Sequence, residues 1–101
     1  MVTINFTHKA LDDIDHIGEY HSNYSKRFAK RLIQGFFDSA KLLETFPLMG
    51  RVLEEIGESE VREVLHNNYR IVYHIFDDEN IDIITIQHTS RDLKQHLPNF
   101  E

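Results

Sequence analysis

The first hydrophobic positions of the chain alternate with polar ones and then change to a helical spacing. The alternation predicts a strand over residues 2–6, where the hydrophobic positions are Val2, Ile4 and Phe6. Thr7 then stands where a helix N-cap is expected. Apolar residues recur at helical spacing beyond it, at Leu11, Ile14 and Ile17. Three acids favour the start of this helix, where the helix dipole is positive: Asp12, Asp13 and Asp15.

A second and longer helix is predicted from Ser25, as its N-cap, to about Thr45. Its apolar stripe consists of Phe28, Leu32, Phe36, Ala40 and Leu43. Pro47 and Gly50 end it, since neither continues a helix well. The break between the two helices is only a few residues long, so we expect them to form an antiparallel hairpin.

The period changes to two beyond Arg51, which indicates strands. A short irregular strand is predicted over 52–56, followed by strands over 60–66, 69–76 and 81–88 with tight turns at 67–68 and 77–80. A short helix is predicted over 91–97. The order of strand, helical hairpin and antiparallel β-meander predicts an α+β fold, in a single domain over 1–101, whose helices cover one face of the sheet.

The turns give a provisional strand register in which Leu65 lies opposite Arg70, Arg70 opposite Gln87, and Tyr73 opposite Ile84. The face assigned to the core then carries Val64, Ile71, Tyr73, Ile75, Ile84 and Ile86. The face expected to be exposed carries Val61, Glu63, Leu65, Arg70, Val72, His74, Ile83, Thr85 and Gln87. Arg70 is the only cation at the centre of this second face.

Composition narrows the class of protein without naming a function. The net charge is −6, from 17 acidic and 11 basic residues, so any contact with nucleic acid needs a local basic patch. Cysteine is absent, which excludes disulfides and thiolate metal sites. No apolar run approaches the ~20 residues that cross a bilayer, and residues 1–9 lack the pattern of a signal peptide. We therefore expect a cytoplasmic protein with no membrane contact and no cofactor. The seven histidines show no ligand spacing, so no metal site is expected.

Four short motifs occur in order: Phe46-Pro47-Leu48-Met49-Gly50-Arg51, Val61-Arg62-Glu63, Tyr69-Arg70-Ile71-Val72-Tyr73 and Gln87-His88-Thr89-Ser90-Arg91-Asp92. Together with the order of elements they resemble the RelE/ParE toxin superfamily, also called plasmid-stabilisation proteins, over nearly the whole chain. The resemblance implies the toxin of a type II toxin–antitoxin pair, bound by a cognate antitoxin. The P-x-x-G-R, V-R and H-x-x-R-D elements favour the ParE branch.

The resemblance leaves two targets open. RelE-like members cut mRNA in the ribosomal A site without a metal, and ParE-like members inhibit DNA gyrase. For a nuclease, Arg70 and Arg91 match the phosphate-binding arginines, and His88 is a candidate acid or base, with Lys94 and His96 nearby. These chemistries need positive charge around the phosphate.

Two departures disfavour the nuclease. Val61 and Glu63 stand where RelE-type enzymes carry lysines, and no tyrosine follows Tyr73. The purely structural interpretation of Arg70 is that it only pairs with Glu63 across neighbouring strands. The same reasoning makes His74 and His88 ordinary strand residues.

Residues that could bind a partner lie elsewhere. Lys26, Arg27, Lys30 and Arg31 repeat at i,i+4 spacing on one side of the second helix, as a solvated face or as a docking site for an acidic antitoxin or target. Arg62 is expected to anchor the sheet edge to a helix carboxylate or to the antitoxin. The antitoxin should add a helix or an extended segment near the hairpin and the sheet edge.

The sequence therefore favours a toxin that inhibits DNA gyrase by protein–protein contact. The alternatives are a ribosome-dependent mRNA endoribonuclease and a binding module of the same fold with no toxic activity.

Overall fold

A computed structural model describes residues 1–57 and 60–91 of the chain. Its elements in chain order are β1 (Thr3–Phe6), α1 (His8–Ser22), α2 (Lys26–Leu42), β2 (Arg51–Val52), a 3-10 turn η1 (Glu54–Ile56), β3 (Val61–His66), β4 (Tyr69–Ile75) and β5 (Asn80–His88). The predicted α+β order of strand, helical hairpin and antiparallel meander is confirmed. Of the helix predicted over 91–97, all but Arg91 lies outside the described residues.

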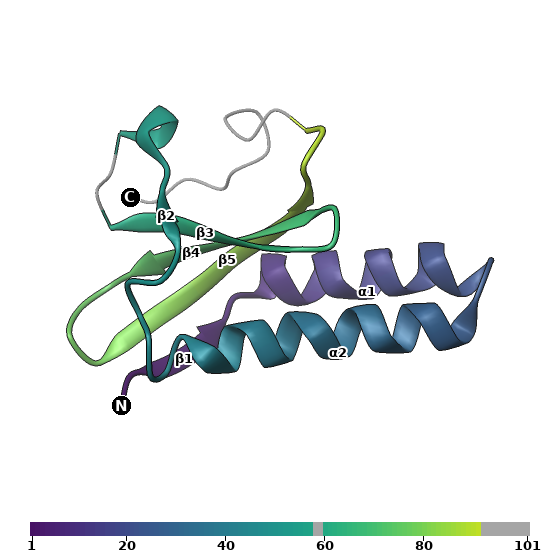
Figure 1. Ribbon diagram of the computed structural model, residues 1–101, viewed down its shortest axis with the longest axis horizontal. Helices are drawn as coiled ribbons and strands as arrows, with labels where there is room; N and C mark the ends of the chain where they lie inside the picture. The colour runs from purple at the N-terminus through teal and green to yellow at the C-terminus, as the bar shows by residue number, and fades with distance from the viewer. Residues whose placement is uncertain (58–59, 92–101) are drawn as a thin grey trace.

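The strands form one sheet in the order β1-β5-β4-β3-β2. The strand β1 is parallel to β5, whereas the β2–β3, β3–β4 and β4–β5 pairs are antiparallel. In Figure 1 the two helices run antiparallel and side by side along one side of the sheet. Residues of both helices share a hydrophobic core with β4 and β5, including Ile14, Phe36, Ile71, Tyr73 and Ile83. The hairpin therefore covers one sheet face, as the hydrophobic pattern predicts.

Both predicted helix caps are present. Thr7 and Ser25 have extended backbones, and their hydroxyls accept hydrogen bonds from the N–H groups of Ala10 and Phe28. The second helix ends at Leu42 rather than near Thr45, because residues 43–45 continue with the tighter i→i+3 bonds that often finish a helix. In the part of the chain that is described, no helix has the length and apolar character needed to cross a membrane.

The register prediction is right at one end of the β4–β5 pair and wrong at the other. Arg70 lies opposite Gln87 and Val72 opposite Thr85, but a β-bulge next to Val72 places Tyr73 opposite Ile83. The bulge puts one extra residue into β5, which reverses the alternation beyond it. Ile83 therefore packs in the core under the helices, and Ile84 packs on the other face.

The second sheet face is not open, contrary to prediction. Val61, Val72 and Ile84 form a small cluster there with Leu53, and Ile56 of η1 packs against it. Glu63, Thr85 and Gln87 of the same face are also buried. The segment that follows β2 folds back over this face, so the sheet has a main core on the helix side and a smaller one opposite.

Candidate functional site

The cation at the centre of the second sheet face, Arg70, is paired with a buried carboxylate. Glu63 is 4% exposed, and its Oε1 lies 3.1 Å from Nε of Arg70, whose side chain is 17% exposed. These two atoms form an ion pair without the alignment of a hydrogen bond. The other carboxylate oxygen, Oε2, accepts hydrogen bonds from Arg51 at 2.8 and 3.3 Å. Of the two interpretations left open for Arg70, the structure shows the pairing with Glu63.

Arg51 and Arg70 thus share one carboxylate. The hydrogen bond from Arg51 to Glu63, followed by the charge of Glu63, raises the pKa of the Arg51 guanidinium above its ordinary value. Each guanidinium has Glu63 as its negative neighbour, so one negative charge is shared by two positive ones. Arg70 is therefore engaged in an ion pair within the sheet face.

The three residues proposed for catalysis do not converge. His88 lies opposite Tyr69, one residue along from the Arg70–Gln87 pair, so the side chains of His88 and Arg70 point to opposite faces of the sheet. The Ser90 N–H donates to Nδ1 of His88 over 3.1 Å. The neutral His88 ring consequently carries its proton on Nε2.

His88 and Arg91 instead share a cleft of about 390 Å³ between α1 and the end of β5, and its other lining residues include His16, Tyr20 and Tyr69. Tyr69 and His21 hydrogen-bond through the phenol oxygen and Nε2 at 2.9 Å. Burial, and then the proximity of Tyr20, raises the pKa of the Tyr69 phenol, so it stays protonated at neutral pH. Sequence reasoning missed this cleft, because its members are brought together from α1, β4 and β5.

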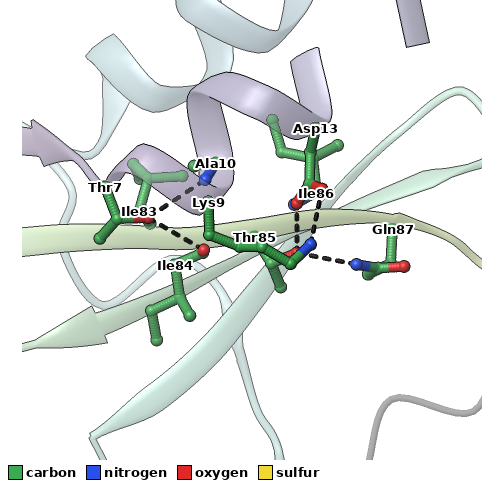
Figure 2. Close-up of polar contacts among 9 residues, drawn as sticks. All are labelled: Thr7, Lys9, Ala10, Asp13, Ile83, Ile84, Thr85, Ile86 and Gln87. Atoms are coloured by element: carbon green, nitrogen blue, oxygen red, sulfur yellow. Dashed lines mark hydrogen bonds and ion pairs between the residues drawn. The ribbon is translucent and has the colours of Figure 1, made fainter. Parts of the chain in front are cut away.

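One wall of the cleft is fixed by a polar seam between α1 and the edge of β5 (Figure 2). Oδ2 of Asp13 accepts hydrogen bonds from the Thr85 hydroxyl and from the Ile86 N–H. Lys9 forms an ion pair with Asp13 and also donates to Thr85. At the start of α1, the Thr7 hydroxyl lies within hydrogen-bond distance of the carbonyls of Ile83 and Ile84.

This seam corrects the role expected for the acids of α1. The first turn of α1 contains no acid, because the helix begins at His8 and Asp12 is already its fifth residue. Asp13 satisfies a strand N–H at the position where β1 has left the edge of β5. No sequence signal could have found this contact, which joins residues 72 positions apart.

The basic residues of α2 form an exposed surface that we call the basic stripe: Lys26, Arg27, Lys30 and Arg31. Within residues 1–57 and 60–91, no ion pair involves any of the four. Lys26 and Lys30 also line a groove between the helices, which Asp15 and Glu19 of α1 line too. The stripe therefore presents concentrated positive charge on a protein whose formal net charge is −6.

Arg62 does not reach a helix carboxylate. Its Nη1 donates to the carbonyls of Leu48 and Gly50, at 3.1 and 3.0 Å, in the connector between α2 and β2. The Tyr73 hydroxyl donates to the Pro47 carbonyl at 2.9 Å and accepts from the Gly50 N–H at 3.0 Å. Gly50 is required here, because a Cβ would lie 2.5 Å from the Tyr73 hydroxyl and 2.7 Å from the Glu63 carbonyl.

No group of three or more side chains suited to hold a metal ion occurs in the described part of the chain. The described residues present four candidate surfaces: the paired arginines on the sheet, the α1–β5 cleft, the basic stripe and the braced connector.

The order of elements, the mixed sheet and the helical hairpin on one face define the chain as an α+β protein with the RelE/ParE toxin fold. The model of the family described as "ParE toxin of type II toxin-antitoxin system, parDE" matches residues 4–93. The chain therefore belongs to the ParE toxin family, and the expected superfamily and its ParE branch are confirmed.

Solved structures give the same fold. A chain of the chromosomal ParDE toxin–antitoxin system from P. aeruginosa superposes with a TM-score of 0.71 at 20% identity, covering 87% of this chain and 96% of that one. A chain of the RelBE2 toxin–antitoxin complex from Mycobacterium tuberculosis gives 0.65 at 22% identity, covering 86% and 96%. The comparison with curated proteins gives no match.

Proposed function

We propose that this ParE-family toxin acts by binding a protein target, DNA gyrase, and that it does not cleave RNA. The observation that best supports this proposal is the ion pair between Arg70 and the buried Glu63. RNA cleavage without a metal needs uncompensated positive charge where the phosphate reacts. Here Glu63 is buried between Arg51 and Arg70, and His88 lies on the other side of the sheet.

The most concentrated exposed positive charge among the described residues lies on α2 instead. The basic stripe is exposed and spans nearly two turns at the start of the helix, at a spacing that aligns Lys26 with Lys30 and Arg27 with Arg31. Such a surface attracts an acidic protein partner and accelerates its association. Either the cognate antitoxin or the target can supply that acidic partner.

A cognate antitoxin is part of the same proposal. The structural neighbours are chains of toxin–antitoxin systems, and the family is defined by such a system. We expect the antitoxin to bind near the helical hairpin and thereby to keep the toxin from its target. The protein would then act inside the cell that makes it, in the cytoplasm.

The first experiment is a supercoiling assay with purified gyrase, relaxed plasmid and the full chain. We expect inhibition at micromolar toxin, relieved by the product of a neighbouring antitoxin gene. A fourfold K26Q/R27Q/K30Q/R31Q variant should inhibit less, whereas Lys41→Gln, on the same helix, should inhibit like the parent chain. Full supercoiling at ten micromolar parent toxin would exclude gyrase as the target.

The α1–β5 cleft keeps a RelE-like endoribonuclease as a second candidate. It brings together the guanidinium of Arg91 and the imidazoles of His16 and His88. The rings of Tyr20 and Tyr69 line the same cleft and could stack on an RNA nucleobase. Primer extension on mRNA from a translating extract tests this candidate. New 3′ ends at A-site codons that disappear with Arg91→Gln would favour it over gyrase inhibition.

A further inference from the structure

The connector between α2 and β2 exposes a group of large apolar side chains. Phe46 is 57% exposed and Leu48 is 64% exposed, and Met49 and Leu42, the last residue of α2, are exposed as well. We call these four residues the apolar ridge. Exposed apolar residues are ordinary when they are scattered, but four within eight consecutive positions form a candidate contact surface.

The ridge is rigid, although it lies on a loop. Tyr73, which is fully buried, and Arg62 together bond to the backbone of Pro47, Leu48 and Gly50 from beneath. The N–H groups of Phe46 and Met49 donate to the carbonyls of Leu42 and Phe46. These hydrogen bonds tie the connector backbone to β3 and β4 while its apolar side chains stay exposed. Rigid presentation lowers the entropy that a partner must remove on binding.

Acidic side chains line two hollows beside the connector that carries the ridge. A hollow of about 530 Å³ is lined by Pro47 of the connector together with Glu44, Asp78, Glu79 and the N-terminal Met1. The turn that carries the last two is ordered, because Oδ1 of Asp77 accepts the Glu79 N–H at 2.8 Å. A second hollow of about 250 Å³ is lined by Leu42 and by Asp38, Lys41 and Glu44.

We propose that the apolar ridge and its acidic border form a docking surface for a protein segment that carries both apolar and basic side chains. Apolar side chains of the partner would pack on Phe46 and Leu48, and its lysines or arginines would meet Glu44 and Glu79. The charge of the border selects this occupant: nucleic acid and anionic lipid headgroups would be repelled by it.

A second copy of the chain, bound through the same surface, would place the two acidic borders against each other. A second copy could instead bind head to tail, with its basic stripe on the ridge of the first. Such self-association would appear as concentration-dependent shifts in the experiment below. The stripe and the ridge lie toward opposite ends of α2. From Arg31 of the stripe to Leu42 of the ridge the helix axis rises about 17 Å, at 1.5 Å per residue. The two surfaces have opposite charge, so they would take different partners, and the ridge does not depend on the identity of the toxin's target.

The test is an NMR titration of the ¹⁵N-labelled full chain with a 14-residue amphipathic peptide of leucine and lysine. We expect amide shifts at residues 42–50 and 78–79. A leucine–glutamate peptide of the same pattern and a serine–lysine peptide should cause much smaller shifts. A Phe46→Ser/Leu48→Ser variant should bind the leucine–lysine peptide roughly tenfold more weakly, with its amide dispersion showing that the fold is intact.

Controls separate this surface from general stickiness and from the proposed function. Leu65→Ser removes an equally exposed leucine on β3 and should leave the affinity unchanged, as should the fourfold basic-stripe variant. Glu44→Gln/Glu79→Gln should weaken binding and reduce its dependence on salt. Shifts centred on the groove between the helices, equal binding of the leucine–glutamate peptide, or concentration-dependent shifts of the ridge without peptide would overturn the proposal.

Discussion

At the scale of single residues, several buried or part-buried polar groups of this protein hold backbone and side chains in place. The hydroxyl of Tyr73 joins a carbonyl and an N–H of the connector, Asp13 completes the edge of β5, and Glu63 joins two arginines. Each of these groups would leave a partner without a hydrogen bond or a counter-charge if it were removed. The same residues therefore give the most direct tests of the fold.

Tyr73→Phe keeps the ring in the core and removes only the hydroxyl. The Pro47 carbonyl and the Gly50 N–H then lose their partner, and we expect the free energy of unfolding to fall by about 1–3 kcal/mol. Urea denaturation followed by circular dichroism measures the change. Tyr24→Phe, at an exposed position, should change stability by less than about 0.5 kcal/mol; similar losses in both variants would contradict the role given to the connector.

Alkaline pH should destabilise the protein through the same phenol. Burial raises the pKa of Tyr73 above its ordinary value of about 10, although the Gly50 N–H and the charge of Arg62 partly oppose this. The folded state then binds the proton more tightly than the unfolded state, so this contribution to stability is complete below pH ~10 and is lost as the pH rises through the folded pKa. Melting temperatures measured from pH 8 to 11 should fall less steeply in Tyr73→Phe than in the parent chain.

Glu63→Gln tests the carboxylate shared by the two arginines. Arg70 would keep its charge at a mostly buried position without a counter-charge, and we expect a loss of about 2–4 kcal/mol. Glu60→Gln, on the exposed segment just before β3, serves as the matched control and should stay close to the parent in thermal melts. If Glu63→Gln were as stable as the parent, the carboxylate would not be needed to balance Arg51 and Arg70.

At the scale of elements, the bulge in the β4–β5 pair decides which side chains reach which core. Without it Ile84 would lie opposite Tyr73 on the helix side, but the bulge places Ile83 opposite Tyr73 under the helices and Ile84 against Leu53 and Val72. Strict alternation would put Ile84 and Thr85 on opposite faces, whereas here both lie on the face of Val72. The bulge therefore decides which of the two isoleucines enters the larger core.

Ile83→Ala and Ile84→Ala should consequently destabilise the protein by similar amounts, about 2–4 kcal/mol each, since each leaves a cavity in a packed cluster. Chemical denaturation of the two variants measures this. Leu65→Ala, at an exposed position of β3, is the control and should have little effect. A neutral Ile84→Ala variant would show that the smaller core contributes nothing to stability.

At the scale of the whole molecule, charge is distributed unevenly between the two ends of α2. The start of the helix carries the basic stripe, and the connector beyond its end is apolar with acidic neighbours. A small protein with a net charge of −6 can therefore attract partners of either sign at separate surfaces.

This distribution predicts salt dependence for the interaction of the basic stripe with an acidic partner. Raising the salt concentration from 0.05 to 0.5 M, about a tenfold change in ionic strength, should slow association of the parent chain with its antitoxin or target by roughly tenfold. The K26Q/R27Q/K30Q/R31Q variant should show a smaller effect of salt, with an unchanged melting temperature. Stopped-flow association rates provide the measurement, and equal salt dependence in both proteins would exclude the stripe as the docking site.

Local sequence signals predicted the elements well, because caps, turns and periodicity act over a few residues. Thr7 and Ser25 cap their helices, Asn67 adopts the positive φ of 54° that a tight turn requires, and the Arg70–Gln87 pairing follows from counting along two strands. The Arg70–Glu63 pair was predictable for the same reason, since the two side chains share a face on neighbouring strands.

What the sequence by itself determined is the α+β order, the face that meets the helices, and the sign of the charge on each segment. Only the tertiary structure decided the parallel place of β1 beside β5, the bulge that brings Ile83 rather than Ile84 under the helices, the role of Asp13, and the separation of Arg70 from His88. These features depend on contacts between residues far apart in the chain, where packing and hydrogen bonding across elements, rather than local preference, set the lowest free energy.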